Sequence, residues 1–284
     1  MSLALVYLSR GVDGGLCSAE DFFEAYRTFP AGCSHDLIVI AKGWSCSNGK
    51  DEMRRLAEMH NASVVEMPDD GLDWGAYMRL APQISHDYIC FLNTHSRPCV
   101  DGWLNLLRIA ANTSETDVGA VGATASWETL APALPQPSVR AENNSPLVYP
   151  LRLIRNTVNF LKNRRNFQSF PNPHLRSNAF IVRRRLFLDF IGAQKIPKCR
   201  LDSAILESGR SGFPAYLASH SLRVLVAGAD GKVYRPDQWI NSGTFRVPGQ
   251  SNVLVADNQT IAYDSADMNM KKVLEQFAWG REFS

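Results

Sequence analysis

The sequence lacks the cysteine patterns, glycine-rich loops and long apolar runs that identify several common protein classes. Its six cysteines form no C-x-x-C pair, so neither a zinc site nor a disulfide framework is indicated. No G-x-G-x-x-G or G-K-[ST] loop occurs, which argues against a dinucleotide enzyme and a P-loop enzyme. No apolar stretch reaches the ~20 residues that cross a bilayer, and no secretory leader is recognisable. We therefore expect a cytoplasmic protein with reduced thiols.

Basic residues are concentrated in one segment, although the formal net charge is only +2. Residues 151–200 hold twelve Lys or Arg and one acidic residue, a balance of +11, whereas the rest of the chain carries −9. Within this segment, apolar residues recur at helical spacing from Leu151 to Leu161, which predicts an amphipathic basic helix over 151–165. Such a helix fits an anionic membrane surface, so peripheral attachment at the inner face of the cell membrane is one expectation. Packing of its apolar side in the core is the alternative.

Strand and helix patterns alternate along the first half of the chain. Strands are predicted at 3–8, 36–41, 63–67, 88–92 and 118–123, and helices at 19–28, 51–60, 74–80 and 103–111. Ser18 is the expected N-cap of the first helix. A proline-rich loop over 126–150 separates this half from further elements at 179–182, 185–191, 223–227 and 268–279. The pattern predicts one α/β domain over 1–284, a three-layer sandwich around a mostly parallel sheet.

Polar and aromatic residues follow these strands, where open α/β sheets bind their ligands. The densest cluster opens the helix after the third strand. There, carboxylates can accept hydrogen bonds from nucleoside hydroxyls and an indole can stack on a ring. Capping of the helix by Asp73 is the alternative interpretation. From these loops, the residues predicted to bind a nucleotide are Tyr7, Ser9, Lys42, Asp69, Asp70, Asp73 and Trp74.

The region of the fourth strand resembles the glycosyltransferase A (GT-A) fold, in particular family 2 glycosyltransferases and their bacterial polysaccharide-assembly relatives. The resemblance is carried by the apolar run Tyr88–Leu92, the polar residues that follow it, and Gly102-Trp103-Leu104. In that family an Asp-x-Asp motif ends this strand and holds a divalent metal on the donor diphosphate. Asn93 and His95 replace the two aspartates here, which weakens the case for Mg²⁺. His95 could ligate Mn²⁺ or donate a hydrogen bond to a phosphate, and both alternatives stay open.

The resemblance implies transfer of a sugar from a UDP-, GDP- or dTDP-linked donor to a glycan or lipid-linked acceptor, with inversion, in cell-surface polysaccharide synthesis. It places the catalytic base at Glu207, with Asp202 as the second candidate, because an acceptor hydroxyl must lose its proton as it attacks. Arg176 is expected to bind the leaving diphosphate through its guanidinium group.

The same resemblance divides the domain into two halves. Residues 1–125 are expected to bind the nucleotide sugar, and residues 126–284 to bind the acceptor and supply a C-terminal lid or helix. Candidates for acceptor or lid contacts are Trp127, Asn178, Asp257 and Asn258. A turn between elements explains Asp257 and Asn258 equally well.

Two other function classes are compatible with the sequence. A sugar-phosphate nucleotidyltransferase would use a basic, glycine-rich loop after the first strand, and Ser9–Gly15 is a weak version of one. A non-catalytic carbohydrate-binding or scaffold module would explain the replaced aspartates. Nucleic acid is not an expected partner, because the basic segment contains no recognisable binding module.

Overall fold

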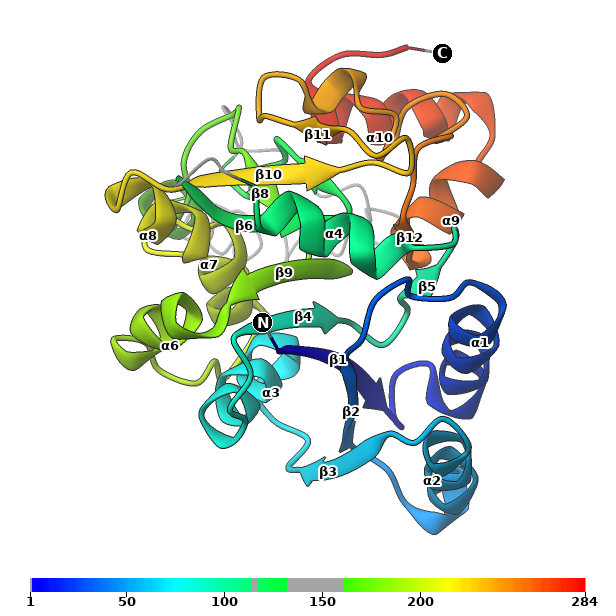
Figure 1. Ribbon diagram of the computed structural model, residues 1–284. Helices are drawn as coiled ribbons and strands as arrows, with labels where there is room; N and C mark the ends of the chain where they lie inside the picture. The colour runs from blue at the N-terminus through cyan, green and yellow to red at the C-terminus, as the bar shows by residue number, and fades with distance from the viewer. Residues whose placement is uncertain (1, 114–116, 132–160, 284) are drawn as a thin grey trace, which may run out of the picture.

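A central eight-stranded sheet organises the molecule (Figure 1). The computed structural model describes residues 2–113, 117–131 and 161–283. The strands of the sheet are β1 (Leu3–Arg10), β2 (Asp36–Lys42), β3 (Ser63–Met67), β4 (Tyr88–Leu92), β6 (Val118–Gly122), β9 (Ala179–Arg183), β10 (Arg223–Ala227) and β11 (Val233–Tyr234). Two small two-stranded sheets pair β5 (Arg97–Pro98) with β12 (Val255–Ala256) and β7 (Ala125–Ser126) with β8 (His174–Leu175).

The helices connect these strands. They are α1 (Gly15–Thr28), α2 (Lys50–Met59), α3 (Leu72–Leu80), α4 (Trp103–Ala111), α6 (Arg184–Gly192), α7 (Arg200–Ser208), α8 (Phe213–Ser219), α9 (Asn258–Ser265) and α10 (Met268–Trp279). Short 3-10 helices lie at η1 (Cys46–Asn48), η2 (Ala81–Gln83) and η3 (Trp239–Asn241). Residues 161–166 are also helical.

The strand order contains the feature that positions a ligand site. The order is β11-β10-β6-β9-β4-β1-β2-β3, so the chain runs outward from β1 to β3 and then returns to place β4 on the other side of β1. In this sheet β10, β6, β4, β1, β2 and β3 run parallel to one another. Strand β9 pairs antiparallel with both β4 and β6. Ligands of open α/β sheets bind at such a reversal of strand order, beyond the carboxyl ends of the strands.

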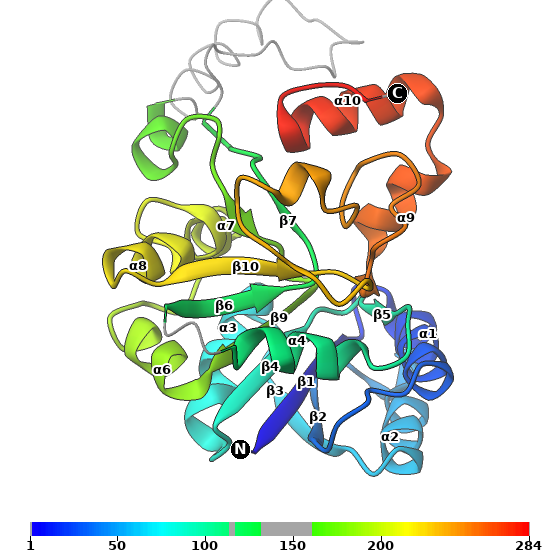
Figure 2. The ribbon, with the colours of Figure 1, turned by 45° about the horizontal axis from the view of Figure 1, so that its top comes forward.

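Alternation of side chains along the strands produces two hydrophobic layers. In β1, Ala4, Val6 and Leu8 face one side of the sheet, where α3, α6, α7 and α8 pack. Residues between them on β1 face the other side, which α1, α2 and α4 cover (Figures 1 and 2). Because successive strand residues point to opposite faces, continuous apolar runs require helices on both sides. The predicted α/β, three-layer GT-A (Rossmann-like) fold with a mostly parallel sheet is thus confirmed.

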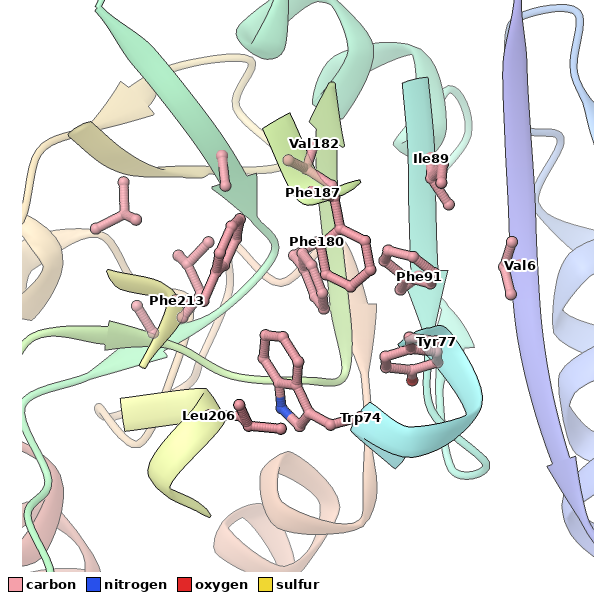
Figure 3. Packing of buried hydrophobic residues seen from close by; sticks show 14 of the residues in the cluster. Val6, Trp74, Tyr77, Ile89, Phe91, Phe180, Val182, Phe187, Leu206 and Phe213 are labelled. Carbon is pink, nitrogen blue, oxygen red and sulfur yellow. The ribbon is translucent and has the colours of Figure 1, made fainter. Parts of the chain in front are cut away.

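An aromatic cluster fills the layer between the sheet and α3 (Figure 3). The Trp74 ring stacks on Phe180 and Phe187 at centroid separations of 5.9 and 6.1 Å, and Phe213 approaches it edge-on. Trp74 is only 3% exposed. Its expected stacking on a nucleoside is therefore corrected: burial by three phenylalanines leaves the indole no face for a ligand.

The first helix begins earlier than expected. It starts at Gly15, and its N-cap is Gly14, which has φ of +79°. The left-handed region is accessible to glycine without steric cost, so the chain turns here from β1 into α1. Ser18 is consequently not the cap but an interior residue of the helix, and its hydroxyl faces His95 Nδ1 at 3.3 Å.

The predicted basic helix over 151–165 and the loop over 126–150 lie mostly outside the described residues. The membrane expectation attached to that helix therefore stays a prediction. Among the helices in the described ranges, none combines the length and apolarity that crossing a bilayer requires.

We predict that Trp74→Ala lowers the free energy of unfolding by about 3–5 kcal/mol, because it empties the centre of the aromatic cluster. Urea unfolding of the purified protein measures the change. Ile109→Ala is the control, since Ile109 is 53% exposed on α4, and its effect should stay within about 0.5 kcal/mol. Equal effects of the two variants would contradict the core role of Trp74.

Candidate active site

A polar cavity lies where the strand order reverses, beyond the carboxyl ends of β1, β3 and β4. Its volume is about 300 Å³, at the lower end of the range for small-molecule sites. The lining residues come from six separate regions of the chain: Asp13, Asp73, Asn93, Thr94, His95, Arg176, Ser177, Arg200, Asp257, Asn258 and Gln259. The fold thus gathers Asp73, Asn93, His95, Arg176, Asp257 and Asn258, all of them candidates from the sequence, around one space.

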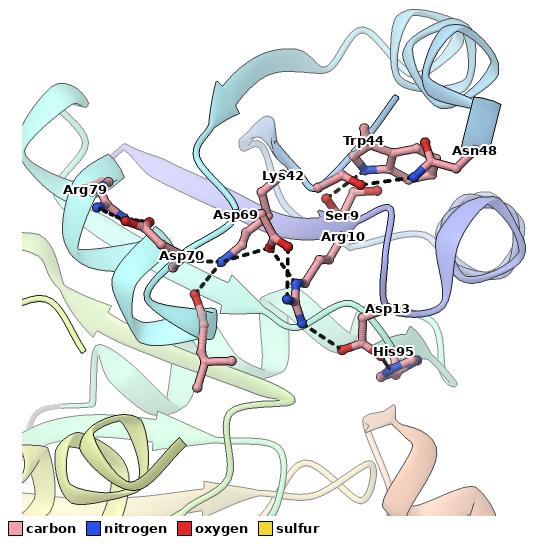
Figure 4. A network of polar contacts seen from close by, with 12 residues as sticks. Ser9, Arg10, Asp13, Lys42, Trp44, Asn48, Asp69, Asp70, Arg79 and His95 are labelled. Atoms are coloured by element: carbon pink, nitrogen blue, oxygen red, sulfur yellow. Dashed lines mark hydrogen bonds and ion pairs between the residues drawn. The ribbon is translucent and has the colours of Figure 1, made fainter. Parts of the chain in front are cut away.

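Lys42 holds the loop that carries Asp73 (Figure 4). The ammonium group is buried, and it donates hydrogen bonds to the carbonyl oxygens of Asp70 at 2.7 Å and Leu72 at 2.9 Å. Burial lowers the pKa of Lys42, and the neighbouring Asp69 carboxylate opposes this effect. Lys42 was expected to contact a donor nucleotide. The structure corrects this to a positioning role, because the ammonium group is buried and donates to carbonyl oxygens of the loop between β3 and α3.

The first two carboxylates of this loop are also bound within the protein. Asp69 accepts two hydrogen bonds from Arg10, at 2.7 and 3.1 Å, and these hold its pKa below the usual range. Asp70 accepts from Arg79 Nη2 at 2.9 Å. Neither residue lines the cavity. Both carboxylates therefore fix the loop, and their contact with a nucleotide stays a prediction.

Asp73 differs from these two carboxylates. The N-cap of α3 is Gly71, in the left-handed region, so Asp73 is not the cap, and its carboxylate makes no hydrogen bond within the described residues. It faces the cavity. Burial raises its pKa, while the positive charge of Lys42 counteracts that rise. An unpaired carboxylate in this position is suited to accept hydrogen bonds from ligand hydroxyls.

The turn after β4 presents Asn93 and His95 to the cavity. Asn93 Oδ1 accepts hydrogen bonds from the His95 backbone N–H at 3.0 Å and from Ser96 Oγ at 2.9 Å. The ring of His95 lies between Ser18 Oγ, 3.3 Å from Nδ1, and Asp13 Oδ1, 3.4 Å from Nε2. Both side chains are therefore held by protein contacts that fix their orientation.

These residues do not fit a divalent metal. Over the described ranges, no group of three or more His, Cys, Asp or Glu side chains is arranged to hold a metal ion. Both ring nitrogens of His95 face protein groups, and the amide oxygen of Asn93 already accepts two hydrogen bonds. Mg²⁺ and Mn²⁺ need several oxygen or nitrogen ligands, which the side chains of this turn do not offer.

Glu207 lies beside the cavity, in the last turn of α7. Its Oε1 accepts a hydrogen bond from the Ser177 N–H at 3.1 Å, and Ser177 itself lines the cavity. Burial raises the pKa of Glu207 to about 7, against the opposing charge of Arg176. The negative charge of Asp73 adds to the rise. A carboxyl group with a pKa near neutrality can accept and release a proton at physiological pH.

Asp202, the second candidate base, has a structural role. It lies in the first turn of α7, and its Oδ2 accepts a hydrogen bond from the Lys198 N–H at 2.9 Å. It does not line the cavity. The two carboxylates of α7 are thereby distinguished by their partners. Glu207 is bound to Ser177, which lines the cavity, and Asp202 fixes the start of the helix.

Arg176 belongs to a charge cluster that the sequence reasoning missed. Arg176 and Arg246 both approach Glu128, with guanidinium-to-carboxylate distances of 3.7 and 3.8 Å. Both also lie over the ring of Phe245, at 4.6 and 4.9 Å from its centroid. Burial, together with the charge of Arg176, lowers the pKa of Arg246 to about 10. No local sequence pattern indicates this cluster, because its charged members Glu128, Arg176 and Arg246 are more than 40 positions apart in the chain.

Other cavity residues were also missed. Arg200, Gln259 and Asp13 line the cavity without having been assigned a role. For Asp13 a signal existed, since it follows the first strand, where ligand contacts of α/β folds are expected. Arg200 lies at the start of α7, and Gln259 in the first turn of α9 accepts a hydrogen bond from Arg246 Nη2 at 2.7 Å.

Several predicted ligand contacts are corrected because the side chains are buried. Tyr7 is fully buried and donates to the carbonyl oxygens of Ser18 and Thr94. Ser9 is likewise buried within β1. Asn178 donates to Val255 O at 2.8 Å and accepts from Thr124 Oγ1 at 2.6 Å, which fixes the segment that enters β9.

Two of the expected lid residues join the C-terminal segment to the rest of the domain. Trp127 donates from Nε1 to Pro236 O at 3.1 Å, and its ring meets Trp279 edge-on. Asp257 is the N-cap of α9, where it accepts from the backbone N–H groups of the first turn. Asn258 is exposed and does line the cavity. The stretch interpreted as a turn is therefore the start of a helix.

Comparisons with known proteins find solved structures of similar fold. Neither a known family nor a curated protein matches the chain. One similar structure is mannosyltransferase PcManGT from Pyrobaculum calidifontis in complex with GDP-Man and Mn²⁺, with a TM-score of 0.48 and 11% identity, covering 82% of this chain and 56% of that one. Another is S. aureus TarS 1–349 in complex with UDP-GlcNAc, with a TM-score of 0.38, 10% identity, and coverage of 66% and 47%.

A CMP:2-keto-3-deoxy-manno-octonic acid synthetase complexed with CTP is similar to a comparable degree. Its TM-score is 0.43 and its identity 11%, covering 80% of this chain and 90% of that one. The chain spans about half the length of the two transferases, 56% and 47%. All three TM-scores are below 0.5.

We predict that Glu207→Gln stabilises the protein at pH 8 and has little effect at pH 5. The folded-state pKa of about 7 lies above the unfolded value, so the stability that protonated Glu207 contributes is lost as pH rises through 7. The free energy of unfolding of the variant, relative to the wild type, should rise by about 1–3 kcal/mol from pH 5 to pH 8. Urea unfolding of both proteins at the two pH values measures it, and a pH-independent difference would contradict the raised pKa.

Proposed function

We propose that this chain is a glycosyltransferase that moves a sugar from a nucleotide-diphosphate donor to an acceptor hydroxyl, with inversion, and that Glu207 is the catalytic base. One observation carries the proposal. A carboxyl group with a pKa of about 7 accepts a hydrogen bond from the N–H of Ser177, a residue that lines the polar cavity at the reversal of strand order. Inverting transfer needs this combination, because a base must accept the acceptor's proton beside a bound donor.

The cavity residues divide into two chemical groups. Asp73 offers carboxylate oxygens to hydroxyl groups of the ribose or of the sugar, and the amide N–H groups of Asn93 can donate to them. Arg176 and Arg200 offer positive charge to the diphosphate, and Arg246 adds charge behind them through the shared Glu128. A guanidinium group binds phosphate oxygens through two parallel hydrogen bonds, so arginines can take the diphosphate charge in this site.

The reaction balances with these groups alone. The acceptor oxygen forms a bond to the anomeric carbon of the sugar as its proton passes to a carboxylate oxygen of Glu207. The bond between the anomeric carbon and the diphosphate oxygen breaks, and its electron pair leaves with the diphosphate. Arg176 and Arg200 stabilise the charge that develops on this leaving group. A glycan or a lipid-linked oligosaccharide in cell-surface polysaccharide synthesis is the acceptor class we propose.

We predict that one of UDP, GDP, CMP and dTDP raises the melting temperature of the protein. A ligand that binds only the folded state at about 100 times its dissociation constant adds about 2.7 kcal/mol of stability. For a chain of this length the shift is on the order of 5 °C. Thermal unfolding with each nucleotide, with and without Mn²⁺, measures it. Absence of any shift would contradict a nucleotide site, and a shift that requires Mn²⁺ would contradict the assignment of the diphosphate charge to arginines.

We predict that Glu207→Gln lowers kcat for sugar transfer about 10²- to 10⁴-fold and leaves the nucleotide-induced thermal shift intact. In the wild type, kcat/KM should rise with pH through an apparent pKa near 7, because the base must be ionised. Asp202→Asn is the matched control and should retain wild-type turnover, because this carboxylate of the same helix is bound to the Lys198 N–H and not to the cavity residue Ser177.

The assay also separates the alternative classes. A nucleotidyltransferase would form a nucleotide sugar from a sugar phosphate and a nucleoside triphosphate, releasing pyrophosphate. A binding module would show the thermal shift with no turnover in the wild type. Full activity of Glu207→Gln would assign the base to another residue.

A further inference from the structure

Two buried N–H groups close to Glu207 have no hydrogen-bond partner among the described residues. They are Nε1 of Trp74, on α3, and Nε of Arg176, which precedes β9. Trp74 is 3% exposed, and the side chain of Arg176 is 19% exposed. Buried indole and guanidinium N–H groups of native proteins nearly always bind an acceptor, because an unpaired donor that has lost its water costs free energy. Each of the two groups therefore indicates a further acceptor beside it.

Both groups line one small cavity together with Glu207. In Figure 3 the indole nitrogen of Trp74 is on the side of Leu206, the residue before Glu207 in α7. The volume of the cavity, about 10 Å³, is close to the smallest that holds one water molecule. Apart from Ser177, its other walls are apolar side chains of Leu175, Phe180, Phe213, Pro214 and Val224. The polar groups therefore border a space that fits one water and little else.

The hydrogen-bonding capacity of a water molecule matches these groups. Its oxygen accepts two hydrogen bonds, and the N–H groups of Trp74 and Arg176 supply two donors. Its O–H can donate to the carboxylate of Glu207, whose Oε1 accepts from the Ser177 N–H and whose Oε2 accepts no hydrogen bond from the described residues. These contacts add up to about three hydrogen bonds, the usual number for a buried water.

We propose that Trp74 and Arg176 hold one water molecule against the carboxyl group of Glu207, and that Trp74 is thereby a positioning residue for the catalytic base. The two N–H groups occupy the lone pairs of the water, so its O–H groups are directed at the carboxylate and favour the ionised form. The description of Glu207 as the base rests on the proposed function, whereas the water site does not. Trp74 thus has a use besides packing, which depends on its one polar atom.

Charged and titratable groups from several elements act on the same carboxyl group. Arg176 lowers the pKa of Glu207, whereas the charges of Asp73 on α3 and Glu128 after β7 raise it. Tyr77, also on α3, is buried, and the charge of Glu207 contributes to the raised pKa of its hydroxyl. A change from Trp74 to phenylalanine leaves all these groups in place. Its effect on Glu207 therefore reports the indole N–H alone.

Trp74→Phe tests the proposal, because it removes the N–H group and keeps an aromatic ring in the core. A water that has lost one of its two donors is held less firmly and stabilises the carboxylate less, so the pKa of Glu207 should rise by about 0.5 to 1. NMR titration of isotopically labelled glutamate carboxyl groups measures this pKa in both proteins, with Glu207→Gln identifying the signal. The titration needs no turnover, so it does not depend on the proposed reaction.

Phe187→Leu is the matched control. Phe187 is fully buried and packs on the ring of Trp74 at 6.1 Å, but it does not line the small cavity and carries no donor. Both variants should lower the melting temperature, because both reduce packing in the same aromatic cluster. Only Trp74→Phe should change the pKa of Glu207. The apparent pKa of kcat/KM should rise with it. A raised carboxyl pKa with an unchanged kcat/KM profile would support the water site and contradict Glu207 as the base.

A crystal structure that resolves ordered waters gives a second measurement, which needs no variant. We expect one water within hydrogen-bond distance of Trp74 Nε1, Arg176 Nε and the Glu207 carboxyl group. Three outcomes would overturn the proposal. They are no water at this position, a direct hydrogen bond from Trp74 Nε1 to Glu207, and a pKa of Glu207 that is unchanged or lower in Trp74→Phe. A lower pKa would mean that the smaller ring admits solvent to the carboxylate.

Discussion

The antiparallel insertion of β9 between β4 and β6 is the constraint on which the candidate active site depends. Its register pairs Ala179 with Leu92, so the residues just before β9 lie beside the carboxyl end of β4. Arg176 and Ser177 thereby reach the cavity that Asn93 and His95 line. A parallel strand at the same place would carry these residues to the opposite edge of the sheet. The direction of one strand thus decides whether the two halves of the chain share a site.

Charge is used in two ways around this cavity. Around the loop before α3, Lys42, Asp69 and Asp70 bind other groups of the protein. Lys42 donates to a loop carbonyl oxygen, and the two carboxylates accept from arginines, so these contacts stabilise the loop. Asp73 and Glu207 are left with raised pKa values, because burial disfavours their charged forms. Carboxyl groups whose ionisation is costly are poor contributors to stability at neutral pH. Their position at a polar cavity is the combination expected of functional groups.

Helix α10 is connected to the charge cluster of Arg176, Arg246 and Glu128. Trp279, on the inner side of α10, hydrogen-bonds the carbonyl oxygens of Phe245 and Arg246, and Arg246 approaches Glu128 together with Arg176. The helix is therefore attached directly to the charge cluster behind the cavity.

The sequence by itself determined where most strands and helices lie, because the periodicity of apolar residues is a local property that each element must satisfy. It also predicted Asp73, Asn93 and His95 as polar residues after strands, and the structure places all three around one cavity. Glu207 was predicted from the family resemblance, and its role as the base stays a proposal. Only the tertiary structure decided the direction of β9, the burial of residues expected to touch a ligand, and the meeting of Arg176 with Arg246. These features depend on pairings between distant segments, and local pattern carries no information about which segments pair or how deeply a side chain is enclosed.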